Sequence, residues 1–231
     1  LAWGLAQRGL AVLRYDKRSY LMNRGEIPVT AEEAANMTAY DDTVEDALAA
    51  VQALKADPRI DPDRVFVVGH SQGAMLAPTI AQEGAGVRGL VLLAGTLRPL
   101  AVVLADQLEA LDSASFAEDI SAARSIAEMT EEEAQKITLI GSNGYFFWEQ
   151  AQHDLAAIAS ACGAPMLILQ GKDDAQVYAD VDFALFEQFA KDHPDKDITL
   201  KLYEGLGHSF TVENAFSPEA LGDIAAWILA R

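Results

Sequence analysis

Short apolar runs alternate with amphipathic stretches along most of the chain. Runs rich in Val, Leu and Ile predict strands at residues 10–15, 64–68, 89–93, 166–170 and 198–203. Apolar residues at helical spacing predict helices between them, including one that ends near residue 8, one at 42–56 and one at 218–229. Uninterrupted apolar strands suit a parallel sheet that is covered on both faces. The alternation therefore predicts an α/β fold, with a mostly parallel sheet flanked by helices.

One long stretch departs from this alternation. Across residues 95–165 helical periodicity continues without a convincing strand. The stretch is too long for a simple crossover between strands, so we expect a crossover helix and a helical cap inserted into the fold. The predicted organisation is a core formed by residues 1–96 and 164–231, interrupted by the crossover helix and cap at 97–163. A polar loop is expected to run from the first strand to Thr30.

A G-x-S-x-G pattern occupies residues 69–73 (GHSQG), between a predicted strand and a predicted helix. Such a turn exposes its serine above the sheet edge, and small residues two before and two after the serine avoid clashes. The N-terminus of the following helix presents N–H groups and a positive dipole end to a developing oxyanion. We therefore predict Ser71 as a nucleophile, against the simpler interpretation of a helix N-cap. Its neighbour His70 is expected to point away from the hydroxyl.

Two later segments supply the partners that an activated serine requires. A base must take the serine proton, and a carboxylate must orient that base. For a nucleophile on this kind of turn the chain order is Ser, then Asp or Glu, then His. Asp173 and Asp174 follow one predicted strand and His208 follows another, so both segments lie at carboxyl ends of parallel strands. His208 is predicted as the base and Asp174 as the acid, with Asp173 as the reserve.

Composition narrows the possible partners. The chain has 35 acidic and 17 basic residues, which gives a formal net charge of -18. Such a surface repels nucleic acid, so we expect no nucleic-acid partner. No apolar run reaches the length of a transmembrane helix. The single cysteine, Cys162, cannot form an internal disulfide and has no metal-ligand spacing around it, so we expect no metal there. Acyl transfer by a serine nucleophile and a histidine base needs no cofactor, and we expect none.

Five segments carry a resemblance to known proteins. They are residues 8–18 (RGLAVLRYDKR), 65–78 (VFVVGHSQGAMLAP), 92–100 (LLAGTLRPL), 165–177 (PMLILQGKDDAQV) and 202–210 (LYEGLGHSF). Together they resemble the α/β-hydrolase superfamily, and more closely its capped bacterial serine esterases. The resemblance implies that Ser71 is the nucleophile, Asp174 the acid and His208 the base. It also implies that the backbone N–H of Gln72 is one oxyanion donor.

The same resemblance raises an expectation about the start of the chain. In the family a second oxyanion donor comes from a Gly-rich loop after an earlier strand, and a strand of that region lies between the strands predicted at 10–15 and 64–68. The chain starts at Leu1 without this region, so we expect a longer gene product. Location, cytoplasmic or secreted, depends on that missing N-terminus, and the oligomeric state is left open.

An aromatic run in the predicted cap has two interpretations. Its members are Tyr145, Phe146, Phe147 and Trp148. They form either the core of the cap or a hydrophobic wall for an acyl or alcohol group of a substrate. The chain length of that group cannot be read from the sequence.

The sequence thus predicts a serine hydrolase that cleaves small carboxylic esters through an acyl-enzyme intermediate. A peptidase or an acyltransferase could use the same three residues. A non-catalytic ligand-binding protein on the same fold is a third alternative, although such proteins usually lose a triad residue. An inactive gene fragment is a fourth, because the first strands are absent.

Overall fold

The chain folds into two compact units. The computed structural model describes residues 1–231, except for the side chain of Ala85. The first unit consists of residues 1–15, 47–97 and 156–231, and the second of residues 16–46 and 98–155. The sequence predicts residues 16–46 to belong to the core, but they cluster with the second unit.

A four-stranded parallel sheet organises the first unit. Its strands are β1 (Phe66–His70), β2 (Gly89–Leu93), β5 (Met166–Gly171) and β6 (Ile198–Tyr203), in the spatial order β1-β2-β5-β6. All three pairings are parallel, which confirms the predicted sheet, and the predicted bounds of β2 are met. Every residue of β2 and β5 is buried, as expected for strands covered on both faces.

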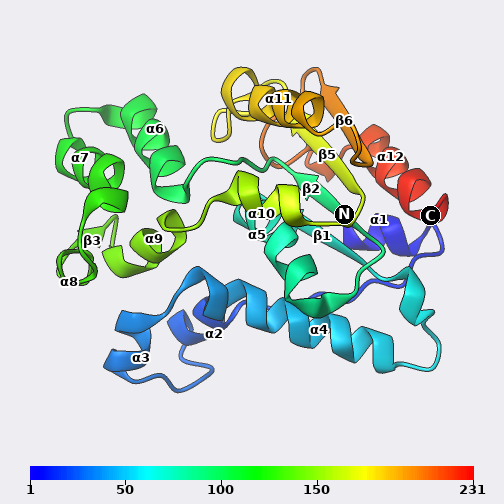
Figure 1. Ribbon diagram of the computed structural model, residues 1–231, viewed down its shortest axis with the longest axis horizontal. Coiled ribbons are helices and arrows are strands. Elements are labelled where there is room, and N and C mark those ends of the chain that lie inside the picture. Colours follow the sequence, from blue (N-terminus) through cyan, green and yellow to red (C-terminus); the bar gives the residue numbers. More distant parts are fainter. The chain divides into compact units, whose positions relative to one another are not determined.

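Helices cover both faces of this sheet (Figure 1). Alternate residues of β2 separate the two faces: Val91 and Leu93 pack toward α1 and α12, whereas Leu90 and Leu92 pack toward α5, α10 and α11. These helices are α1 (Ala2–Ala6), α5 (Gln72–Ile80), α10 (Leu155–Ala161), α11 (Ala184–Asp192) and α12 (Pro218–Leu229). The unit also contains α4 (Glu45–Ala56), the short helices η2 (Pro62–Arg64), η3 (Ala81–Ala85) and η5 (Ala179–Phe183), and the hairpin of β7 (Thr211–Val212) and β8 (Ala215–Phe216).

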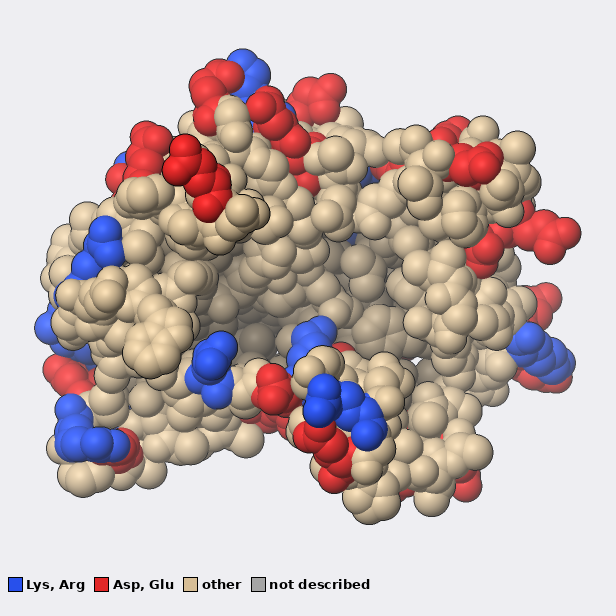
Figure 2. All heavy atoms as spheres, turned by 180° about the vertical axis from the view of Figure 1, so that it is seen from behind, with Lys and Arg blue, Asp and Glu red and all other residues tan. Residues whose placement is uncertain are grey.

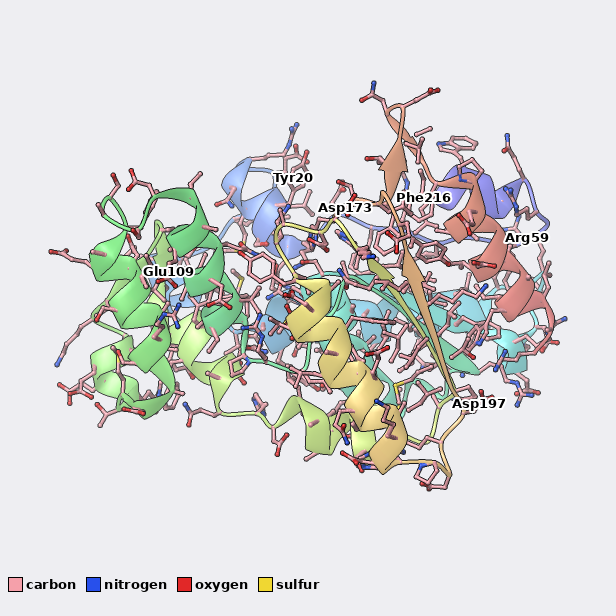
Figure 3. The ribbon with its side chains drawn as sticks, turned by 90° about the horizontal axis from the view of Figure 1, so that it is seen from above. Tyr20, Arg59, Glu109, Asp173, Asp197 and Phe216 are labelled. Atoms are coloured by element: carbon pink, nitrogen blue, oxygen red, sulfur yellow. The ribbon has the colours of Figure 1, made fainter. Side chains whose placement is uncertain are left out.

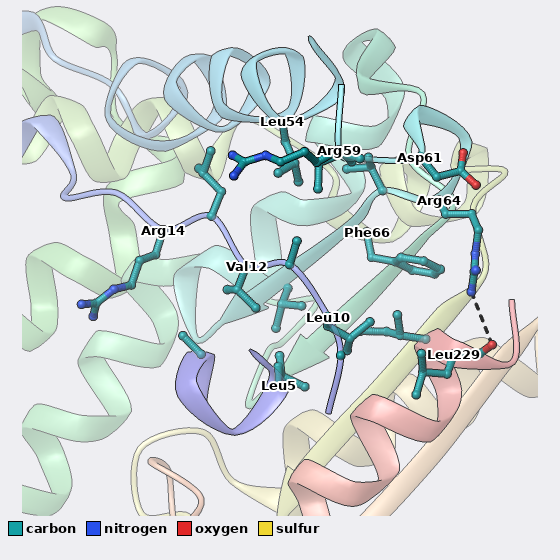
Figure 4. Close-up of a pocket in the computed structure, with 18 of the residues that line it drawn as sticks. Leu5, Leu10, Val12, Arg14, Leu54, Arg59, Asp61, Arg64, Phe66 and Leu229 are labelled. Carbon is teal, nitrogen blue, oxygen red and sulfur yellow. Dashed lines mark hydrogen bonds between the residues drawn. The ribbon is translucent and has the colours of Figure 1, made fainter. Parts of the chain in front are cut away.

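The strand predicted at residues 10–15 is not formed. The segment has no regular structure, and Val12, Leu13 and Tyr15 are each at least 40% exposed. A groove of about 510 Å³, lined by Leu10 and Val12 on one side and by Phe66 on the other, separates the segment from β1 (Figure 4). Within the described part of the chain no strand lies beside residues 10–15 to take up their backbone hydrogen bonds, so their apolar pattern alone does not produce a strand.

The second unit is mostly helical, in agreement with the periodicity of residues 98–155. It contains α2 (Arg18–Asn23), α3 (Ala31–Asn36), η1 (Tyr40–Val44), α6 (Leu100–Asp112), α7 (Ala117–Ser125), η4 (Ile126–Glu128), α8 (Glu131–Ala134), α9 (Gly144–Ala151) and the two-residue strands β3 (Thr138–Leu139) and β4 (Ser142–Asn143). Its core is formed by apolar faces of α6, α7 and α9, with Leu104, Ile126 and Phe147 among the buried residues. The helix α2 lies within the polar loop that the sequence predicts, and the β3–β4 hairpin was not expected.

Polar contacts order residues 16–46 and connect them to the rest of the second unit. Arg18 forms an ion pair with Asp46 at 2.6 Å, and the Ser19 N–H donates to the buried Asp42 carboxylate at 2.8 Å. The Asn143 side-chain amide, on β4, donates a hydrogen bond to the carbonyl of Ala35, at the end of α3. The first two contacts are internal to residues 16–46, and the bond from Asn143 connects these residues to the rest of the unit.

The high negative charge is distributed over the surface. On the face drawn in Figure 2, acidic side chains form several separate groups, with lysine and arginine side chains among them. This distribution agrees with solvated helix faces rather than with one dedicated binding patch. In the described part of the chain, no helix has both the length and the apolar character needed to span a membrane.

Candidate active site

Ser71 occupies a strained turn between β1 and α5. Its φ is 55° and its ψ is −121°, a conformation that residues other than glycine rarely adopt. Three backbone hydrogen bonds hold it there: the Ser71 N–H donates to the Leu93 carbonyl at 2.8 Å, and the Ser71 carbonyl accepts from the Ala74 and Met75 N–H groups at 2.9 and 3.2 Å. The serine predicted from the G-x-S-x-G pattern therefore lies, half-buried, on a sharp strand-to-helix turn at the carboxyl end of β1.

The two glycines of the motif have different roles. A Cβ on Gly69 would lie 2.2 Å from the Gly73 carbonyl oxygen, so this position excludes any side chain. A Cβ on Gly73 would meet no described atom within 4 Å outside the backbone of its own helix. Steric exclusion therefore explains the glycine two residues before Ser71 but not the glycine two residues after it.

Helix α5 begins at Gln72, directly after the serine. The first turn of a helix directs its backbone N–H groups away from the helix, and the aligned peptide dipoles place about half a positive charge there. An anion that forms next to the Ser71 hydroxyl would lie close to these groups. The Gln72 N–H, at the start of α5, is therefore placed as the predicted oxyanion donor would need to be.

Asp174 is buried, with 5% of its surface exposed, and each of its carboxylate oxygens accepts two hydrogen bonds. One oxygen accepts the backbone N–H groups of Gln176 and Val177, at 2.8 and 3.0 Å. The other accepts the Gln170 side-chain amide at 3.0 Å and the His208 Nδ1–H at 2.9 Å. Burial by itself raises the pKa of Asp174, but the hydrogen bonds from His208, Val177 and Gln176 outweigh it and the pKa lies below its ordinary value.

The neighbouring Asp173 has a different environment. It is exposed on the loop after β5, at the opposite end of the sheet from Asp197 (Figure 3). Its backbone N–H donates to the Leu206 carbonyl at 3.0 Å. Of the two adjacent aspartates, Asp174 is the one whose carboxylate contacts His208.

His208 lies on the loop after β6, and 13% of its side chain is exposed. Because its Nδ1 donates to a carboxylate, Nε2 is the ring nitrogen left to act as a proton acceptor in the neutral imidazole. The His208 carbonyl accepts a hydrogen bond from His70, the residue that precedes Ser71, at 2.8 Å. Among the described atoms no hydrogen bond joins the Ser71 hydroxyl to His208; the contact with His208 comes from His70, the residue before the serine. In unliganded sites the bond between nucleophile and base is often long.

Close backbone packing brings the two loops together. A Cβ on Gly171 would lie 2.3 Å from the Leu206 carbonyl oxygen, so the end of β5 can approach the His208 loop only with glycine at this position. The Lys172 N–H donates to the Tyr203 carbonyl at 2.9 Å, one residue beyond the end of the strand pairing. Gly171 thus sets the separation between the loop that carries Asp174 and the loop that carries His208.

Two residues near the site were not identified from the sequence. Gln170, 1% exposed, fixes Asp174 with its side-chain amide, but its place in an apolar strand gave no signal of a polar role. His70 was expected to point away from the hydroxyl, and it contacts His208. The G-x-S-x-G pattern contains His70, but its side chain contacts His208 on the loop after β6, which the pattern does not include.

The aromatic run of the predicted cap lies in α9 of the second unit. Phe147 is buried in the core of that unit, and Trp148 donates its indole N–H to the Met129 carbonyl at 2.8 Å. Tyr145 stacks on Trp148 with ring centroids 5.8 Å apart, and Phe146 packs edge-on against Phe147. Each aromatic ring therefore has a partner within its own unit, and a role of these residues in substrate binding stays a prediction.

Gly171→Ala should separate the two loops. The added methyl group cannot fit against the Leu206 carbonyl, so we expect hydrolytic activity to fall by about 100-fold, the size typical of an ångström-scale misplacement of catalytic groups. Gly163→Ala is the matched control, because a Cβ there meets no described atom within 4 Å. Steady-state kinetics with an activated ester tests this. Equal activity of the two variants would contradict the steric role of Gly171.

Asp174→Asn should reveal a pH-dependent contribution to folding. Because the folded pKa lies below that of the unfolded chain, the carboxylate stabilises the fold fully above the unfolded value of about 4, and this contribution is lost as the pH falls through the folded pKa. The difference in unfolding free energy between wild type and Asp174→Asn should therefore be large at pH 7 and shrink below about pH 4. Urea unfolding at several pH values measures it, with the exposed Asp173→Asn as control. A difference that is the same at pH 7 and pH 3 would exclude this role.

A curated protein is similar to much of this chain. Esterase EstD of Thermotoga maritima is 36% identical over 179 residues, which cover 77% of this chain and 41% of that protein. The chain thus spans less than half the length of this curated relative.

Solved structures share the fold at low sequence identity. A monoacylglycerol lipase of Paleococcus ferrophilus has a TM-score of 0.50 and 18% identity over 81% of this chain and 76% of its own. An acylaminoacyl peptidase of Pyrococcus horikoshii has a TM-score of 0.56 and 15% identity over 87% of this chain and 28% of its own. The family model described as "Serine aminopeptidase, S33" matches residues 1–215. The chain belongs to this family of α/β-hydrolases.

Proposed function

We propose that this chain forms the catalytic part of a serine esterase, with Ser71 as nucleophile, His208 as base and Asp174 as the acid. One observation carries the proposal. A histidine whose Nδ1–H is bonded to a buried carboxylate contacts His70, and His70 is followed directly by a serine on a strained turn at a helix N-terminus. This is the combination of nucleophile, base and orienting group that activates a serine.

The first half of the proposed reaction forms an acyl-enzyme. The Ser71 oxygen attacks the ester carbonyl while His208 Nε2 takes the hydroxyl proton. Asp174 stabilises the imidazolium through the Nδ1–H bond. The tetrahedral oxyanion accepts a hydrogen bond from the Gln72 N–H at the start of α5. The carbon–oxygen bond to the alcohol then breaks, and His208 gives its proton to the departing alkoxide.

The second half returns the enzyme to its starting state. His208 removes a proton from a water molecule, whose oxygen attacks the acyl carbonyl. The bond between the acyl carbon and the Ser71 oxygen breaks, the serine takes the proton back from His208, and the carboxylic acid leaves. The chain's own residues supply each proton transfer.

The choice of ester over peptide rests on the relative named as an esterase, at 36% identity. The description of the family model as a serine aminopeptidase favours the second candidate, a peptidase that uses the same residues. The two reactions differ in the leaving group, because an amine requires a proton from His208 more strongly than an alcohol does.

A fluorophosphonate probe should label Ser71 and no other serine. The expected result is a single modified peptide that contains Ser71, and no labelling of Ser71→Ala. Ser160→Ala is a matched control, because the Ser160 hydroxyl is also bonded to a histidine, His193, at 2.9 Å, but lies near the end of a helix instead of at its start. Peptide mass spectrometry reads the site. A folded protein that shows no labelling at Ser71 would exclude the proposed nucleophile.

The kcat/KM values for an ester and an amide substrate should distinguish an esterase from a peptidase. We expect a short p-nitrophenyl ester to have a kcat/KM about 100-fold or more above that of an aminoacyl p-nitroanilide, because only the poorer leaving group depends fully on general-acid catalysis. Both substrates release the same kind of chromophore, so one spectrophotometric assay compares them. Faster cleavage of the anilide would replace the esterase proposal with the peptidase one.

A further inference from the structure

His70 makes two contacts with the base of the candidate site. Its Nε2 lies 2.8 Å from the His208 carbonyl oxygen, and its ring lies 4.7 Å from the His208 ring, centroid to centroid, with an interplanar angle of 55°. A carbonyl oxygen only accepts hydrogen bonds, so Nε2 of His70 is the donor and carries a proton. The tautomer of a neutral His70 is thereby determined.

The environment also keeps His70 neutral. Burial is the largest influence and lowers the pKa of His70, and the nearby His208 lowers it further; the bond to the carbonyl and the charge of Asp174 act in the opposite direction without reversing the shift. A neutral His70 avoids placing a second positive charge beside His208 when that residue becomes an imidazolium during catalysis.

The hydrogen bond from His70 to the His208 carbonyl joins two segments that are far apart in the chain. His70 is covalently joined to Ser71, so its bond to the His208 carbonyl connects the backbone of the nucleophile to the backbone of the base. Asp174 holds the same histidine from the other side, through its ring. One contact determines the orientation of the imidazole, and the other determines how far the loop after β6 stands from the serine.

We propose that His70 is a positioning residue, whose Nε2–H holds the His208 loop at the distance from Ser71 that proton transfer requires. The proposal rests on the proposed function, since it assumes that Ser71 and His208 react as a pair. A displacement of about 1 Å between reacting groups can cost about 100-fold in rate. The bond therefore acts on the chemical step more than on substrate affinity.

Three variants test this role. His70→Ala removes the donor. His70→Gln keeps an N–H donor at a similar distance from the backbone, whereas His70→Asn places it closer to the backbone, where it cannot reach. We expect kcat for an activated ester to fall about 10- to 100-fold in His70→Ala, with KM within about two-fold of wild type. His70→Gln should recover most of the loss, and His70→Asn should not.

His193→Ala is the matched control. His193 also stacks on an aromatic ring, that of Phe189 at 4.3 Å, and also bonds a backbone carbonyl, but near the C-terminus of α11. It should keep the wild-type kcat. Urea unfolding of His70→Ala and His193→Ala shows whether the two lose comparable stability. If His70→Ala does not fold, the kcat values of His70→Gln and His70→Asn test the positioning role instead: a higher kcat for the Gln variant supports it, and equal values contradict it.

The outcomes distinguish this inference from the proposed function. If the fluorophosphonate does not label wild-type Ser71, the proposed function fails. If wild type is labelled and folded His70→Ala reacts at the same rate with unchanged kcat, only the positioning role is overturned. An equal loss of kcat in His70→Gln and His70→Ala also overturns the positioning role, because restoring an N–H donor would then not restore activity.

Discussion

The carboxylate of Asp174 must keep its hydrogen bonds, and much of the candidate site is arranged around that requirement. An ionised group with 5% exposure has little access to water, and each unmet bond would cost about 1–3 kcal/mol or more. Its partners come from a strand, from its own loop and from the loop after β6. The bond to His208 is one of the four, so the same constraint that permits a buried charge also orients the histidine.

The backbone of Ser71 is strained, and neighbouring contacts must hold it in that conformation. A non-glycine residue at φ 55° costs about 1–3 kcal/mol and persists only when its surroundings leave no alternative. Here the serine N–H is bonded to β2, and the backbone of Gly69 lies close against that of Gly73. The parallel register of β1 on β2 is therefore what holds the serine on this turn.

The sequence predicts the centre of the sheet because β2 and β5 are buried on both faces, and burial leaves a continuous apolar run. It also predicts the contact between Asp174 and His208, because both follow strands that end at one edge. It fails at residues 10–15, where an apolar pattern needs a neighbouring strand that the described chain does not provide. Gln170 and His70 could not be assigned for a related reason. Their roles depend on contacts with residues far along the chain, which periodicity does not record.

The first unit is discontinuous in sequence, and this has a consequence for its synthesis. Its segments are residues 1–15, 47–97 and 156–231, so the ribosome finishes all of the second unit before it makes β5. Until then β2 has one strand edge without its partner. His208 follows later still in the chain. A nascent chain would therefore expose an aggregation-prone strand edge while residues 94–165 are made, and the three candidate site residues are present together only after His208 has been added.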